Sequence, residues 1–229
     1  MHEDGTLRGP MTAAAAPSPT PAPLPAGTSF LDDRAKARAV LAVKAFEEKT
    51  SAELVVTVKK RVRVYHEAHR LWGSVFAFAG LLFLLFFPLD FDVMLMPVDT
   101  VLAFGIGYGL SRFLAPMERA ALGEQKRRES VDQAAKAAFY DLGVSKTTGR
   151  TGVLVYVSVL EHVVAVVPDA GITPEARQAL VEAKAKLEAA LVALDVSSFA
   201  STLEALGAAF APTMARAADD VNELSDEVR

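Results

Sequence analysis

Acidic side chains beside a glycine-containing turn are the first candidates for chemistry in this chain. Asp169 follows an apolar run and lies two residues before Gly171. Ligands commonly bind at strand ends in α/β folds, and carboxylate oxygens are the ligands that Ca²⁺ and Mg²⁺ prefer. Together with Glu53, and with Glu161 or the acids near the end of the chain, Asp169 could therefore form a cation site. The alternative is an aspartate that only shapes a turn. We expect Asp169 and Glu53 to be metal ligands.

A polar loop precedes the same apolar run. Thr148, Arg150 and Thr151 offer hydroxyl groups and one guanidinium beside a glycine, which is a composition that can hold a phosphate group. The loop lacks the GxxxxGK[ST] spacing of a P-loop. The sequence thus indicates a candidate ligand loop, with hydroxyls that cap neighbouring turns as the alternative.

The sequence lacks the residue patterns that several classes of chemistry require. The 229-residue chain has no cysteine, which excludes disulfides, thiolate nucleophiles and cysteine-bound zinc. Its net charge of −4 gives no electrostatic case for binding nucleic acid. His66 and His69 are three residues apart, whereas the HExxH zinc motif needs four. No residue can be assigned as catalytic from these patterns.

Two long apolar blocks interrupt the chain. Residues 72–89 contain no charged side chain, and residues 93–114 are nearly as apolar. Helices of this length match the thickness of a bilayer, so we expect a transmembrane helical hairpin over residues 72–115. A buried helical hairpin inside a soluble core is the alternative. Asp99 would complement the dipole of the second helix or act as an intramembrane acid.

Basic residues flank both blocks and are absent from the short acidic link between them. By the positive-inside rule, both termini and the soluble domain lie in the cytoplasm of a two-pass protein, which we place in a bacterial inner membrane. Gly105 and Gly109 form a GxxxG pair that permits close helix contact, either between the two blocks or in a homo-oligomer. The expected partners are the lipid bilayer and a membrane protein.

The remaining segments predict one α/β domain in two parts. Residues 1–29 form a Pro/Ala-rich tail without apolar bulk, which we expect to be disordered. Helices are expected over residues 31–49 and 116–142, from Thr173 onwards and around residues 199–210, and strands over residues 51–60, 153–158 and 162–167. Residues 30–71 and 116–229 are thus the two parts of the domain, the second ending in an acidic tail.

Three segments resemble the TPM-domain family. They are residues 48–58, a helix-to-strand junction; residues 147–172, with a Gly-Val-Leu strand, a hairpin and a turn containing glycine; and the acidic Asp-Asp-Val-Asn-Glu-Leu of residues 219–224. The similarity covers residues 30–60 and 125–223. It implies a small central mixed sheet sandwiched by helices, here interrupted by the transmembrane hairpin.

The resemblance also implies a role linked to membranes. Members of the family act in photosystem repair or as auxiliary subunits of receptors, and acid phosphatase activity and divalent-cation binding are associated with some of them. This chain differs in that its apolar blocks interrupt the domain, where many relatives carry a signal peptide. We expect a non-catalytic binding or scaffold module for a membrane protein. The alternative is a divalent-metal-dependent phosphatase.

Overall fold

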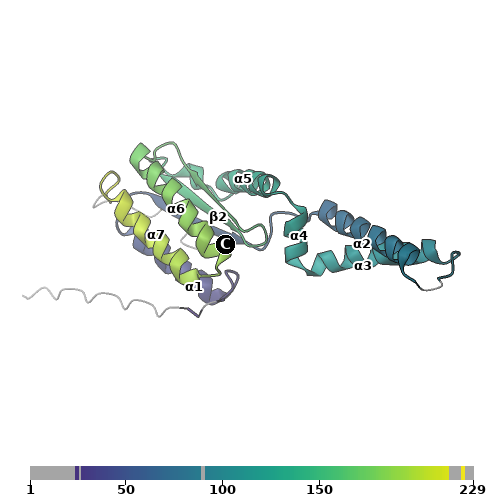
Figure 1. Ribbon diagram of the computed structural model, residues 1–229. Helices are drawn as coiled ribbons and strands as arrows, with labels where there is room; N and C mark the ends of the chain where they lie inside the picture. Colours follow the sequence, from purple (N-terminus) through teal and green to yellow (C-terminus); the bar gives the residue numbers. More distant parts are fainter. Residues whose placement is uncertain (1–23, 26, 89–90, 217–222, 225–229) are drawn as a thin grey trace, which may run out of the picture.

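The computed structural model describes residues 24–25, 27–88, 91–216 and 223–224. Its elements are α1 (Asp33–Glu47), β1 (Glu53–Lys59), α2 (His66–Phe86), α3 (Met96–Phe113), α4 (Ala115–Ala121), α5 (Glu124–Asp141), the 3₁₀ turn η1 (Val144–Lys146), β2 (Gly152–Ser158), β3 (Val163–Pro168), α6 (Pro174–Val192) and α7 (Val196–Phe210). Figure 1 shows an α/β domain from which the helical pair α2 and α3 projects, with α4 at the junction.

The sheet has three strands in the order β1-β2-β3. β1 and β2 are parallel, with Glu53 opposite Gly152, and β2 and β3 form an antiparallel hairpin. A parallel pair needs a long crossover connection. Here α2, α3, α4 and α5 all lie in that connection, so the projecting helices are inserted within the α/β domain.

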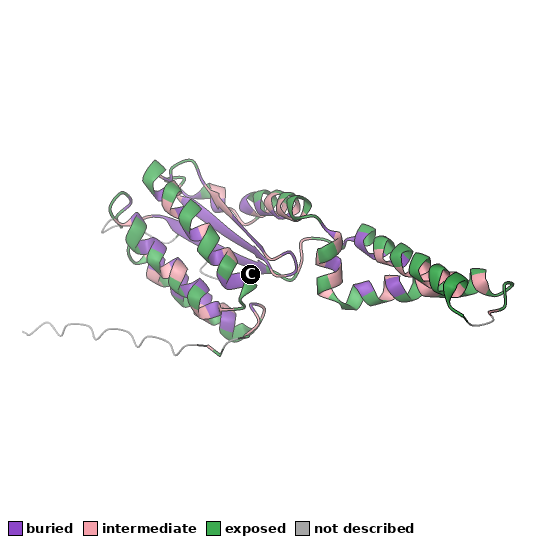
Figure 2. Ribbon diagram, viewed as in Figure 1, coloured by how far each residue is buried: buried purple, intermediate pink, exposed green. Residues whose placement is uncertain are grey.

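Helices cover both faces of the sheet. Alternate strand residues such as Val56 and Val155 pack against α1, α6 and α7, whereas Leu154 and Tyr156 pack against α5. Because both faces are covered, the strands are apolar at nearly every position. Figure 2 shows this burial. Each fully buried valine or leucine side chain contributes about 1.5–3 kcal/mol to the hydrophobic stabilisation.

The helical pair packs through glycines. A Cβ atom added at Gly107 of α3 would lie 2.6 Å from Phe76 Cβ and 2.6 Å from the Trp72 carbonyl oxygen, and one added at Gly73 would lie 2.7 Å from the Phe104 ring. The GxxxG residues behave differently, because added Cβ atoms at Gly105 and Gly109 would meet nothing within 4 Å. Close contact between α2 and α3 therefore depends on Gly107, which lies between the two glycines of the GxxxG motif.

The expected fold class is wrong in its transmembrane hairpin. The structure is a mixed α/β chain with a small three-stranded mixed sheet, and among its described helices α2 alone is long and apolar enough to cross a membrane. α3 falls short because Pro97, Asp99 and Arg112 lie within its 18 residues and dilute their apolar character. The apolar run of residues 93–114 is therefore longer than the helix that it contains, and the helix is less apolar than the hairpin prediction requires.

Two other sequence predictions concern residues that lie largely outside those described. The N-terminal tail is described only from residue 24, and there Leu24 packs against the main core. The acidic link between the apolar blocks includes residue 90, which also lies outside the described ranges.

The base of the helical pair is tied to the domain. Tyr65 and Ala68, at the start of α2, form an apolar cluster with Leu122 and with Leu160 of the β2–β3 hairpin. The indole N–H of Trp72 donates a 2.7 Å hydrogen bond to the Met117 carbonyl of α4. These contacts fix the helical pair to the hairpin end of the sheet.

Candidate functional site

The candidate site lies at the end of the sheet opposite this junction. β1 and β2 begin there with Glu53 and Gly152, and the antiparallel β3 ends there with Pro168. The strand directions thus bring Glu53, the polar loop before β2 and Asp169 to one end of the domain. Glu161, the third carboxylate proposed for a cation site, lies at the other end, in the β2–β3 hairpin.

Asp169 is buried and held by an arginine from the polar loop. Its Oδ1 atom accepts hydrogen bonds from Arg150 Nε at 3.2 Å, from Arg150 Nη2 at 3.0 Å and from the Ala170 backbone N–H at 2.7 Å. The carboxylate is only 4% exposed. Its Oδ2 atom is buried and has no hydrogen-bond partner among the described residues. One oxygen of Asp169 is therefore committed to structure and the other is uncommitted.

The ionised form of Asp169 is favoured. Burial raises the pKa of this carboxyl group, but the hydrogen bonds from Arg150 and from the Ala170 N–H outweigh burial, so that the pKa lies below its usual value. The same interaction raises the pKa of the Arg150 guanidinium. The pair is thus a charged one across the physiological pH range.

The turn after Asp169 requires a glycine. The Gly171 N–H donates a 2.8 Å hydrogen bond to the Arg150 carbonyl, and a Cβ atom at position 171 would lie 2.2 Å from the Gly149 carbonyl oxygen. Arg150 itself has a positive φ of 52°. The turn and the polar loop therefore fit together through their backbones, and this fit holds Arg150 next to Asp169.

Glu53 binds the C-terminal tail. Its carboxylate accepts hydrogen bonds from the backbone N–H of Glu223 at 2.9 Å and of Leu224 at 3.3 Å. The Glu223 carboxylate in turn accepts a 2.8 Å hydrogen bond from the Thr148 N–H. The tail thus bridges the first residue of β1 and the polar loop. Residues 219–222, the other acids of the expected cluster, lie outside the described ranges.

The polar loop is organised by its own hydroxyl groups. Thr147 Oγ1 accepts a 3.0 Å hydrogen bond from the Thr151 N–H, and the Thr147 carbonyl accepts a 3.0 Å bond from the Arg150 N–H. Such bonds are what the turn-capping interpretation predicts. The Arg150 side chain remains 59% exposed, so its guanidinium can still reach a ligand in solvent.

At this end of the sheet the structure brings Glu53, Asp169 and the loop together, but it does not form an obvious ion cage. Within the described residues, no three His, Cys, Asp or Glu side chains are grouped so that they could hold a metal ion. Asp169 Oδ2 is the one carboxylate oxygen there that is both buried and unpartnered in the described structure. A cation would therefore need further ligands, from a substrate or from water.

A second polar cluster lies at the junction and was not predicted. Glu161 is fully buried; its Oε1 accepts hydrogen bonds from Tyr65 Oη at 2.8 Å and from the Val62 N–H at 3.2 Å, and its Oε2 accepts one from the Ser158 hydroxyl. Burial and the neighbouring Glu161 raise the pKa of Tyr65. The sequence indicated Glu161 only as a possible ligand in the cation site with Asp169. The three-residue spacing from Ser158 to Glu161 was the available signal.

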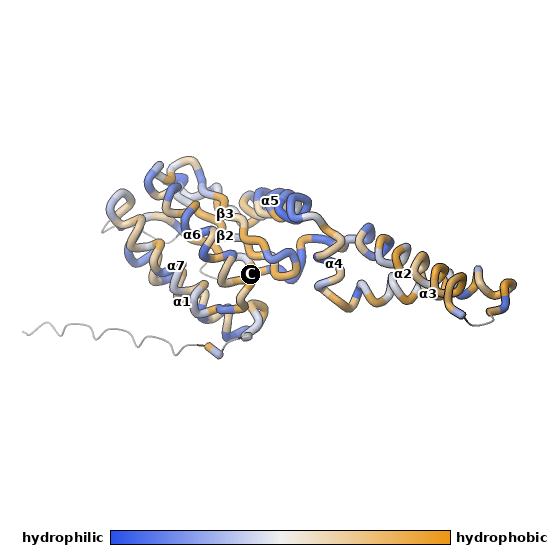
Figure 3. The backbone as a smooth tube through the Cα atoms, viewed as in Figure 1, coloured by the Kyte–Doolittle hydropathy of each residue, from blue (hydrophilic) through white to orange (hydrophobic). Residues whose placement is uncertain are grey.

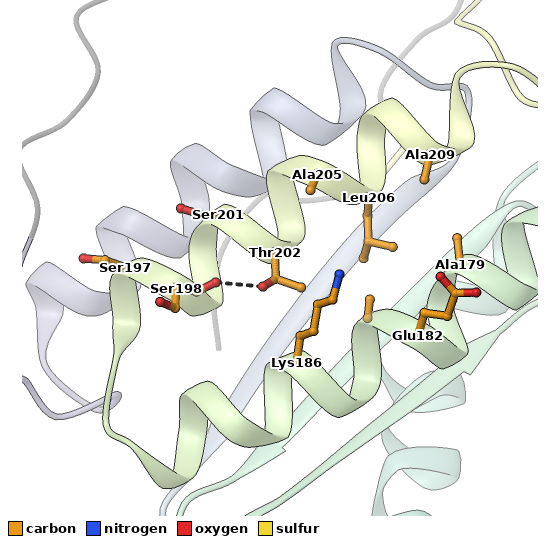
Figure 4. A pocket seen from close by; sticks show the side chains of 11 residues that line it. Ala179, Glu182, Lys186, Ser197, Ser198, Ser201, Thr202, Ala205, Leu206 and Ala209 are labelled. Carbon is orange, nitrogen blue, oxygen red and sulfur yellow. Dashed lines mark hydrogen bonds between the residues drawn. The ribbon is translucent and has the colours of Figure 1, made fainter.

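A groove between α6 and α7 was also not predicted. It has a volume of about 500 Å³ and is lined by small side chains, including Ala179, Ser198 and Ala205. Glu182 and Lys186 of α6 also line it, and the Lys186 side chain points toward α7 (Figure 4). The Thr202 hydroxyl donates a hydrogen bond to the Ser198 carbonyl within this lining. None of the residues predicted for the metal site or the ligand loop lines the groove.

Comparisons with known proteins inform the fold alone. No protein-family model matches the chain, and no curated protein matches it either. Among solved structures, the chain is similar to the BA42 protein of the psychrophilic bacterium Bizionia argentinensis, determined by NMR. The TM-score is 0.51 at 16% identity, over 87% of this chain and 94% of that one. At this identity the similarity concerns the arrangement of elements.

Proposed function

We propose that this protein is a membrane-attached, TPM-like binding module whose α/β domain faces the cytoplasm and scaffolds a membrane protein. The observation that carries the proposal is the apolar surface of the projecting helices. Only 11% of the most apolar stretch of α2 is buried. Figure 3 shows hydrophobic residues along the length of the helical pair, which lies outside the core of the domain.

The exposed side chains on these two helices are large. They include, on α2, Leu71, Val75, Phe78, Leu82, Phe83, Leu85 and Phe86, and on α3, Val98, Val101, Leu102, Ile106, Leu110 and Phe113. Contiguous apolar surface of this kind marks a contact with lipid or with another protein. α2 supplies the attachment in this proposal, because its length and composition suit the bilayer interior. A bacterial inner membrane is the proposed location.

The binding role is favoured over catalysis by what the candidate carboxylates do. Asp169 is paired with Arg150, Glu53 binds the backbone of the tail, and Glu161 is hydrogen-bonded to Tyr65. Each contact joins segments that are distant in sequence. These acids thus contribute to a rigid domain, which is what a scaffold needs.

Co-purification tests this proposal. The full chain would carry an affinity tag and be extracted from membranes in a mild detergent, beside an unrelated membrane protein with the same tag. We expect a defined membrane protein to be recovered at constant stoichiometry with this chain and not with the control. Recovery of the chain alone, under conditions in which known membrane complexes survive, would contradict the scaffold role.

A second candidate function rests on the buried, unpartnered Oδ2 atom of Asp169. An ionised carboxylate oxygen suits Ca²⁺ or Mg²⁺, and the exposed guanidinium of Arg150 suits a phosphate ester. This arrangement favours a divalent-metal-dependent phosphatase as the alternative. Phosphate-ester hydrolysis that needs the metal, disappears in Asp169→Asn and persists in the exposed control Glu175→Gln would establish it. A folded chain that is inactive with several divalent metals would exclude it.

A further inference from the structure

The base of the helical pair carries cationic side chains that have no carboxylate partner. Lys60, Arg70 and Arg112 are exposed, and none forms an ion pair with a described residue. We call these three residues the basic rim. The whole chain has a net charge of −4, so the rim is a local excess of the opposite sign.

The three residues lie near the start of α2 and the end of α3. A 3.0 Å hydrogen bond joins His69 Nδ1 to Ser111 Oγ, which sets the neighbouring Arg70 and Arg112 beside each other across α2 and α3. The carbonyl of Lys60 accepts a 2.9 Å hydrogen bond from the N–H of Leu160, which packs against the start of α2. The rim residues therefore lie near the point where the helices leave the domain.

The carboxylates near the basic rim form ion pairs or hydrogen bonds with residues outside it. Glu67 pairs with Arg63 at 3.8 Å and with Lys126, and the buried Glu118 pairs with Arg61 at 3.3 Å. Glu161 is buried in its own hydrogen-bond cluster. Glu67 also interacts electrostatically with Arg70, but none of these acids forms an ion pair with the basic rim, which remains exposed to an anionic ligand.

Apolar surface begins directly beyond the rim. Leu71 is 50% exposed and follows Arg70 on α2, and Leu110 is 39% exposed and precedes Arg112 on α3, which runs back toward the domain. A cationic cluster that borders exposed apolar helix surface matches the boundary between lipid headgroups and acyl chains. The complementary surface is a leaflet rich in anionic phospholipid, where each nearby Lys or Arg is attracted to the surface charge.

We propose that the basic rim selects anionic phospholipids, so that their phosphate headgroups are concentrated around the base of α2 and α3. The proposal rests on the membrane attachment proposed above and adds the lipid class. It predicts an enrichment that falls as salt is added, because the rim side chains are exposed and their charges are screened.

The single tryptophan, Trp72, supplies a local probe. The full chain would be reconstituted in nanodiscs of phosphatidylcholine and phosphatidylglycerol, with either lipid brominated at the same mole fraction. Bromine quenches tryptophan fluorescence at short range. We expect brominated phosphatidylglycerol to quench Trp72 as if its local fraction were raised at least about twofold at low salt. The difference should vanish at high salt.

Two matched variants make the test specific. Lys60→Gln, Arg70→Gln and Arg112→Gln together should give equal quenching by both lipids. Lys49→Gln, Lys136→Gln and Lys146→Gln remove the same charge from exposed positions elsewhere and should leave the enrichment intact. Equal quenching of the unmodified chain at low salt would overturn the lipid selectivity alone. A chain that stays outside the nanodiscs would overturn the membrane attachment as well.

Discussion

The backbone N–H of Glu223 lies 2.9 Å from the Glu53 carboxylate, which closes a contact across 170 residues. Glu53 is only 7% exposed, and its two carboxylate oxygens accept hydrogen bonds from the backbone N–H groups of Glu223 and Leu224. Glu223 and Leu224 therefore contact the α/β domain at the sheet end that holds Asp169. This contact joins two segments that appeared separately in the resemblance to the TPM-domain family.

We expect Glu53→Ala to weaken the domain. The substitution removes the acceptor for the N–H groups of Glu223 and Leu224. A hydrogen bond to a charged group contributes about 1.5–3 kcal/mol to stability. Urea unfolding should show a loss of about 1–3 kcal/mol. The exposed Glu48→Ala is the control. Unchanged stability, with the tail equally resistant to proteolysis, would show that the contact contributes nothing.

Gly171→Ala should be strongly unfavourable. The new methyl group would meet the Gly149 carbonyl oxygen at 2.2 Å and the Arg150 carbonyl oxygen at 2.7 Å, and backbone atoms cannot move away cheaply. We expect a loss of at least about 2 kcal/mol in the free energy of unfolding. Gly123→Ala, where an added Cβ meets nothing within 4 Å, is the matched control. Equal stability of the two variants would disprove the close approach.

The ion pair of Asp169 predicts a pH dependence with a definite sign. Its pKa is lower in the folded chain than in the unfolded chain, so its contribution is present above the unfolded value of about 3.9 and is lost as the pH falls through the folded value. The stability difference between the unmodified chain and Asp169→Asn should therefore shrink below about pH 4. A difference that stays constant through this acid range, measured by urea unfolding, would contradict the assignment.

Tyr65→Phe should loosen the junction between the helices and the domain. It leaves the buried Glu161 without its 2.8 Å hydrogen bond from the tyrosine hydroxyl. A buried acceptor deprived of a partner costs about 1–3 kcal/mol. Hydrogen exchange should rise first at the start of α2 and in the hairpin. The exposed Tyr140→Phe should change neither, and exchange that rises elsewhere would place the role of Tyr65 outside the junction.

Local patterns predicted most of the secondary structure, but the single helix expected over residues 116–142 is divided into α4 and α5 at Leu122 and Gly123. Near-continuous apolar runs indicated both strands of the hairpin, and Thr173 before a proline indicated a helix start that is confirmed by the 3.3 Å hydrogen bond from the Ala176 N–H to its hydroxyl. Capping and β-branched runs are local properties, which is why one sequence suffices to read them.

The site could be predicted only in its parts. Asp169, Arg150 and Glu53 were singled out by residue type, but their partners depend on strand direction and on the return of Glu223 from the far end of the chain. Helix contacts were also misassigned, since a GxxxG pattern does not say which glycine faces the neighbouring helix. Gly107 does so here.

The most direct test of the membrane attachment is the behaviour of the full chain after bacterial cells are broken. We predict that it sediments with membranes, resists an alkaline wash and is released by detergent. A chain that remains in the detergent-free supernatant as a single monodisperse species would contradict the account. The exposed apolar surface of α2 would then require a different explanation.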